Sequence, residues 1–132
     1  MRVAKKNSWM WPRLRVVIPL AKWMCLQGRA CEHLLAKVLV RPGTVVVTNY
    51  HFTTTKAHVV LQGGEMLEAY IPEALETTSV HPFKGNMDEE RLEALIQRYG
   101  AEKIAFVRME AGTNLIGGQP FSLANLAAVR EI

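Results

Sequence analysis

The sequence has few cysteines and no long apolar run, and each absence excludes a class of protein. A membrane-spanning helix needs roughly 18 or more consecutive apolar residues, and no such run occurs among the 132 residues. Cys25 and Cys31 are too few for a disulfide framework, and their spacing matches no common zinc motif. We therefore expect one compact domain without a membrane segment, with two free thiols, in a reducing compartment such as the cytoplasm.

The sequence also lacks the short motifs of several enzyme classes. It contains no nucleophile elbow, no Walker phosphate loop and no HExxH zinc motif. The histidines lack the close spacing of metal ligands, and they are His33, His51, His58 and His81. We expect them to be surface or core residues, and we expect no metal site.

Acidic residues are absent from the start of the chain. Through Met24 there are six Lys or Arg and no acid, whereas the remainder has ten bases and twelve acids, so the net charge of +4 is the sum of +6 and −2. The three tryptophans, Trp9, Trp11 and Trp23, fall in the same part. This shift predicts a boundary between a basic, Trp-bearing lead at residues 1–24 and a domain at residues 25–132.

The lead allows more than one interpretation. Its apolar stretch at residues 16–21 contains Pro19 and is closed by Lys22, which argues against a secretory signal. Basic side chains interleaved with tryptophan can bind single-stranded nucleic acid by charge and stacking, but no recognisable nucleic-acid fold follows. We do not expect a nucleic-acid partner, although a binding module that uses this arm is kept as an alternative.

Apolar periodicity predicts that helices and strands alternate along the rest of the chain. The predicted helices are residues 31–40, 88–99 and 122–132, and the predicted strands are residues 44–48, 66–71 and 103–108. Residues 52–61 fit either a short helix or a hairpin arm. Strands separated by helices indicate an α/β fold with a largely parallel sheet and flanking helices.

The predicted helices carry apolar side chains at helical spacing. On residues 31–40 we expect one buried face made of Leu34, Leu35, Val38 and Leu39. On residues 88–99 we expect a buried stripe made of Leu92, Leu95, Ile96 and Tyr99. The last helix begins at a Ser122 cap and carries Leu123, Leu126, Ala127 and Arg130.

Three segments have residue types that suit ligand binding. Gln27-Gly28-Arg29 precedes a helix, where free backbone N–H groups, a glycine and an arginine could hold an anion such as phosphate. The alternative is an ordinary loop with a solvated arginine.

The other two segments follow predicted strands, where α/β proteins bind ligands. Residues 49–55 include Phe52, which could stack on a planar ring, and three threonines, although Phe52 could equally be core and the threonines a helix cap. Residues 113–120 include Asn114, which offers a donor and an acceptor, and Gly117-Gly118; the alternative here is a turn without function.

Taken in order, these segments resemble the tryptophanase and tyrosine phenol-lyase family, the pyridoxal-phosphate-dependent β-eliminating lyases. The matching segments are Gln27-Gly28-Arg29, then residues 49–55, 83–86, 100–105, 113–120 and 122–125. The resemblance runs from about Gln27 to Ile132. It implies part of the large domain of the aspartate-aminotransferase-like, type I pyridoxal-phosphate fold.

The resemblance also implies roles for individual residues. Gln27, Gly28 and Arg29 match the residues that hold the cofactor phosphate, and Phe52 matches the aromatic residue that stacks on the pyridine ring. Thr53 matches a neighbouring active-site residue and looks more like the phenol-lyase branch. Asn114 matches the asparagine that hydrogen-bonds the phenolic oxygen of the cofactor.

The sequence departs from the family in two respects. Ala30 and Cys31 stand where the family tends to have Gly-Ala, and their side chains could crowd the phosphate turn. The family's Schiff-base lysine, its ring-pairing aspartate and a phosphate-binding serine lie beyond the position that matches Ile132, and Lys56 and Lys84 are not in the matching context.

We therefore expect a segment of a lyase from a truncated, split or misread gene, inactive alone. The parent reaction would convert an aromatic amino acid, tryptophan or tyrosine, into indole or phenol with pyruvate and ammonia. The resemblance implies a homo-oligomeric parent enzyme. One half of a split enzyme, completed by a second polypeptide that carries the lysine, is a further alternative.

Overall fold

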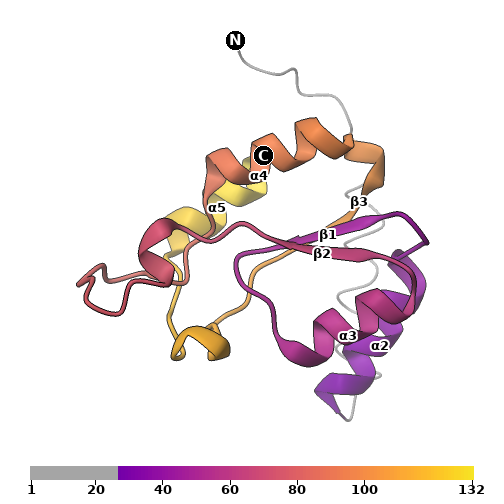
Figure 1. Ribbon diagram of the computed structural model, residues 1–132, viewed down its shortest axis with the longest axis horizontal. Helices are drawn as coiled ribbons and strands as arrows, with labels where there is room; N and C mark the ends of the chain where they lie inside the picture. The colour runs from indigo at the N-terminus through magenta and orange to yellow at the C-terminus, as the bar shows by residue number, and fades with distance from the viewer. Residues whose placement is uncertain (1–26) are drawn as a thin grey trace.

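The computed structural model describes residues 27–132, so the predicted lead at residues 1–24 lies outside the described residues. Helices and strands alternate, as the sequence predicts (Figure 1). The main elements are α2 (Gly28–Leu39), β1 (Val45–Thr48), α3 (Thr53–Leu61), β2 (Glu65–Glu68), α4 (Glu89–Tyr99), β3 (Ile104–Arg108) and α5 (Leu123–Glu131). Short 3-10 turns are η1 (Pro72–Ala74), η2 (Ala101–Lys103) and η3 (Asn114–Ile116).

The strands form a parallel sheet in the order β2-β1-β3, which confirms the predicted α/β class. Val46 at the centre of β1 is in register with Met66 on one side and Phe106 on the other. All four residues of β1 are buried. A strand that is buried on both faces reads as a continuous apolar run, which explains why residues 44–48 have no polar alternation.

The helices cover the two faces of the sheet separately (Figure 1). On one face, α2 and α3 pack against the strands around Ala36, Val40, Val46, Val59, Met66 and Phe106. On the other face lie α4 and α5, around Val45, Val47, Ala69, Met87, Leu92 and Ile104. No helix in the described part of the chain is long and apolar enough to cross a membrane.

Local capping signals locate the helices of the second face. The Asp88 carboxylate accepts from the Arg91 N–H at 3.0 Å, and Gly100 ends α4 with a φ of 84°. Ser122 accepts from the Asn125 N–H at 3.0 Å and begins α5. Residues 52–61, which the sequence leaves open, include the helix α3. The strand predicted at residues 66–71 is observed as β2 (Glu65–Glu68), which ends three residues earlier than predicted.

Two predicted helix faces are partly wrong. On α2, Leu34 and Val38 are 42% and 55% exposed, whereas Ala36 is 2% exposed, because the small alanine side allows close approach to the sheet. On α5, Leu123 is 82% exposed and Asn125 is buried. The Asn125 amide bonds both backbone groups of Met87, at 2.8 and 2.9 Å, and this pairing turns the polar side of α5 inward.

The expectation of free thiols is wrong at Cys31, which is disulfide-bonded, while Cys25 lies outside the described residues. The sequence argument excludes a framework of several disulfides and does not test a single bond at Cys31. Cys31 lies in the first turns of α2.

Replacing Leu92 by alanine tests the packing of α4. Leu92 is 1% exposed, so Leu92→Ala should lower the free energy of unfolding by about 2–5 kcal/mol through lost burial and a residual cavity. The matched change Leu123→Ala, on the exposed side of α5, should change it by less than about 0.5 kcal/mol. Urea unfolding of the two variants measures the difference, and equal losses would contradict the assigned core.

Candidate functional site at the carboxyl edge of the sheet

The candidate site is the edge at which all three parallel strands end. β1 ends at Thr48, β2 at Glu68 and β3 at Arg108. The chain returns to this edge at the start of α2 and the start of α3. This arrangement is the one in which open α/β sheets bind ligands.

The start of α2 presents backbone N–H groups, a glycine and an arginine without an acidic neighbour in the first turn. Gln27 is the N-cap without a side-chain hydrogen bond, and the first turn contains no acid. The N–H groups of Ala30 and Cys31 donate to the Gln27 carbonyl at 3.1 and 3.2 Å. Among the described residues, nothing pairs with the amides of Gly28 and Arg29 or with the exposed Arg29 side chain. The free amides of Gly28 and Arg29 are donors of the kind that a helix N-terminus presents to a phosphate.

Phe52 and Thr53 lie at the start of α3. Phe52 is the N-cap and is half-buried, outside both core clusters, whereas Thr53 is exposed. The threonines do not cap the helix, because the hydroxyls of Thr54 and Thr55 donate to the carboxylate of Glu32. Phe52 therefore lies outside the core clusters, and no threonine hydroxyl caps the helix that it begins.

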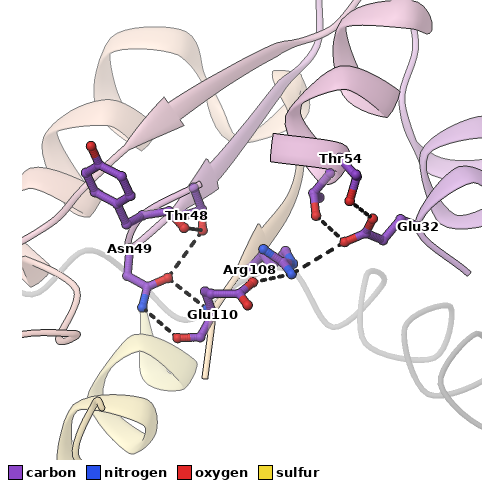
Figure 2. A network of polar contacts seen from close by, with 8 residues as sticks. Glu32, Thr48, Asn49, Thr54, Arg108 and Glu110 are labelled. Atoms are coloured by element: carbon purple, nitrogen blue, oxygen red, sulfur yellow. Dashed lines mark hydrogen bonds and ion pairs between the residues drawn. The ribbon is translucent and has the colours of Figure 1, made fainter. Parts of the chain in front are cut away.

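Glu32 brings the two helix starts together. It lies on α2 and accepts from Thr54 and Thr55 in the first turn of α3. Figure 2 shows the carboxylate facing this turn on one side and Arg108 on the other, with Arg108 Nη2 at 3.8 Å from Glu32 Oε1. The predicted phosphate segment and the predicted ring-stacking segment are thus joined through one side chain.

The network continues from Arg108 to the loops that follow β1 and β3 (Figure 2). Arg108 also pairs with the Glu110 carboxylate. Asn49, which is 1% exposed, accepts from the Glu110 N–H at 2.8 Å and donates to the carbonyls of Glu110 at 3.1 Å and Gly85 at 2.7 Å. Asn49 therefore holds together three loops that are distant in sequence.

Asn114 lies in the loop that Asn49 anchors. It is exposed at the first position of η3 (Asn114–Ile116), and the loop is closed by a bridge between Thr113 and Gln119. Gly117 adopts a left-handed conformation with a φ of 84°, which a glycine reaches without steric cost. Within residues 27–132, no hydrogen bond joins Asn114 directly to Arg29 or Phe52.

Aromatic and charged side chains gather where β1 and β2 end. Tyr50 stacks on His51, with ring centroids 5.3 Å apart, and His51 Nδ1 contacts Glu68. Burial, followed by the nearby Glu68 and Tyr70, raises the pKa of Tyr50 above its usual 10.0. No group of three or more potential metal ligands exists among the described residues.

Sequence reasoning missed Glu32, Arg108 and Glu110. One signal could have found Glu32, since it is the only acid before Pro42 in a strongly basic stretch. Arg108 and Glu110 carry no local signal, because their importance depends on which loops the sheet places side by side.

The fold and this edge define a class: an α/β domain with an uncapped helix start beside the carboxyl ends of parallel strands. The sequence model of the family described as Beta-eliminating lyase matches residues 17–132. The chain belongs to the β-eliminating lyase family, and its fold is the type I pyridoxal-phosphate fold, present in part, as the sequence predicts. The match begins before the boundary predicted at Met24.

Three similar proteins from different bacteria are all named tyrosine phenol-lyase. The chain is 46% identical to tyrosine phenol-lyase of Symbiobacterium thermophilum over 106 residues, which cover 80% of this chain and 23% of the relative. It is 48% identical to tyrosine phenol-lyase of Intrasporangium calvum, over 80% of this chain and 22% of the relative. For the Nostoc punctiforme enzyme of the same name, the identity is 44% with shares of 80% and 23%. The chain matches less than a quarter of the length of these curated relatives.

Substitution of Asn49 tests whether this amide organises the edge. Asn49→Ala should lower the free energy of unfolding by about 2–4 kcal/mol, because it leaves buried backbone groups of Gly85 and Glu110 without partners. Asn114→Ala, at an exposed site, should change it by less than about 0.5 kcal/mol. Urea unfolding compares the two, and a small effect at Asn49 would contradict its anchoring role.

Proposed function

We propose that this chain is a segment of the cofactor-binding large domain of a pyridoxal-phosphate-dependent lyase that acts on an aromatic amino acid. The observation that carries the proposal is the uncapped start of α2, where Arg29 is exposed and has no partner among the described residues. Glu32 links this helix start to the first turn of α3, where Phe52 is the N-cap, in a chain of the β-eliminating lyase family.

The residues at this helix start fit a phosphate group. A methyl group added at Gly28 would meet no atom within 4 Å, so the backbone is accessible on that side of Gly28. Ala30 is exposed and its N–H stays in the helix, which argues against the crowding that its side chain suggests in the sequence. The helix dipole and the Arg29 charge both favour a dianion at this position.

The chemistry of such a lyase depends on its cofactor. Pyridoxal phosphate, when bound, supplies an electron sink that stabilises negative charge next to an amino-acid carbon. In this proposal Gln27, Gly28 and Arg29 hold the phosphate, and Phe52 covers one face of the ring beside Thr53. Asn114 donates a hydrogen bond to the ring oxygen. These residues bind and orient; none of them is proposed to transfer a proton.

We propose tyrosine as the substrate of the parent enzyme, with phenol, pyruvate and ammonia as products. The names of the similar proteins support this choice, and so does the threonine at position 53. Tryptophan, with indole as the product, is the alternative that an assay separates. A homo-oligomeric state and a cytoplasmic location are proposed on the family resemblance alone.

No lysine among the described residues is proposed to attach the cofactor covalently. Lys84 is 8% exposed and donates to the Glu76 carbonyl at 2.7 Å, and Lys56 lies 3.8 Å from Glu68. Lys37, in the last turn of α2, and Lys103, which precedes β3, lie toward the opposite edge of the sheet. We therefore propose that this chain by itself binds the cofactor non-covalently and does not turn over tyrosine.

Replacing Arg29 tests the phosphate site on the full chain. The probe is pyridoxine 5′-phosphate, which has no aldehyde and therefore cannot react with lysines. By calorimetric titration, Arg29→Gln should weaken its binding by about tenfold or more, the loss expected for a charged hydrogen bond. Lys37→Gln makes the same charge change at the other end of α2 and should leave the affinity within about twofold.

The proposal also predicts that the chain alone has no lyase activity. With pyridoxal phosphate and tyrosine, pyruvate should not form above the rate of a protein-free mixture. Rapid pyruvate formation by the purified chain would overturn the assigned non-catalytic role. Equal loss of binding in the Arg29 and Lys37 variants would overturn the site, since it would indicate only a general charge effect.

A further inference from the structure

Glu32 joins three elements at the candidate site, because it lies on α2 and contacts both α3 and β3. Its two carboxylate oxygens accept separately, Oε2 from Thr54 and Oε1 from Thr55, and Oε1 also faces Arg108 (Figure 2). Thr55 is buried and the Glu32 side chain is mostly buried. A carboxylate in such a place, on a helix start that favours anions, needs these partners to offset its desolvation.

We propose that Glu32 is a positioning residue that sets the separation between the phosphate subsite and the ring subsite. It lies one helical turn beyond Arg29, and Thr54 and Thr55 lie directly after Phe52 and Thr53. Its hydrogen bonds therefore hold the two helix starts at one spacing. This inference rests on the proposed function, because it assigns those starts to the two ends of one ligand.

The geometry matters because a phosphorylated pyridine ring is a short, nearly rigid ligand. When both subsites are held at the matching spacing, binding of the ring adds to binding of the phosphate without further loss of freedom. When the spacing varies, the ligand binds through one end at a time. A positioning residue should therefore affect the two-ended ligand while leaving each half-ligand unaffected.

If Glu32 acted only through its charge, its removal would change phosphate affinity in the opposite direction. Its negative charge lies near the phosphate subsite, so removing it should strengthen phosphate binding. The rest of the network also argues for position: Arg108 carries the compensating charge, and its second partner, Glu110, is fixed to the sheet edge by Asn49. Glu32 thereby ties α2 both to α3 and to the end of β3.

Two variants of the full chain test the proposal. Glu32→Gln removes the charge, and Thr55→Val removes one hydroxyl with little change of shape or charge. Calorimetry with pyridoxine 5′-phosphate should show about tenfold weaker binding in both.

Binding of inorganic phosphate and of pyridoxine, the two half-ligands, should stay within about twofold of the unaltered chain. Glu93→Gln, at an exposed site on α4, is the charge-matched control and should bind all three as the unaltered chain does.

A second readout needs no cofactor. The Lys56 N–H donates to the Phe52 carbonyl at 3.0 Å in the first turn of α3. If Glu32 holds this turn, hydrogen exchange at Lys56 should be about tenfold faster in both variants, while the Leu92 amide, bonded to Asp88 at 3.0 Å in α4, should be unchanged. Unchanged exchange at Lys56 would overturn the positioning role, and equal acceleration at Leu92 would do the same, because it would indicate general unfolding.

The outcomes separate this inference from the proposed function. If the unaltered chain binds pyridoxine 5′-phosphate no better than either half-ligand, the proposed function fails, and Glu32 is judged by hydrogen exchange alone. If that chain does bind the two-ended ligand better, unchanged affinity in both variants overturns the positioning role only. Stronger phosphate binding in Glu32→Gln, with no loss in Thr55→Val, would show that the carboxylate acts only through its charge.

Discussion

The burial of β1 on both faces is the constraint from which the rest of the structure follows. Its four residues are buried, so helices must cover the sheet on both sides, and the connections between parallel strands must cross from one edge to the other. The starts of α2 and α3 therefore lie at the same edge as the ends of β1 and β3. The candidate site exists because this topology gathers free backbone donors and loop side chains at that edge.

Gathering these segments does not by itself fix their spacing. That is the contribution of the polar network from Glu32 through Arg108 and Glu110 to Asn49, which joins two helix starts and the loops after two strands. Charged hydrogen bonds in partly buried positions are directional, and leaving one partner unpaired is costly. The network therefore gives the edge a defined shape before any ligand binds.

The sequence predicts much of the fold and part of the site. The apolar stripe at residues 88–99, the Ser122 cap and the β-branched run at residues 44–48 are local signals, and they suffice to predict α4, the start of α5 and β1. The buried faces of α2 and α5 were partly wrong, because periodicity does not show which neighbour packs against a helix, and Asn125 is buried for a hydrogen bond that only the fold creates. Gln27, Gly28 and Arg29 could be proposed from a loop before a helix. The pairing of Glu32 with Thr54, Thr55 and Arg108 joins residues far apart in the chain and has no sequence pattern.

The central claim is that the carboxyl edge binds a phosphorylated pyridine ring between the starts of α2 and α3. Chemical-shift mapping of the isotope-labelled full chain with pyridoxine 5′-phosphate tests it most directly. The account predicts the largest shift changes at the amides of Gly28, Arg29, Phe52 and Thr53, with smaller changes on α5. Largest changes on the exposed side of α5, or changes spread evenly over the basic surface, would contradict it.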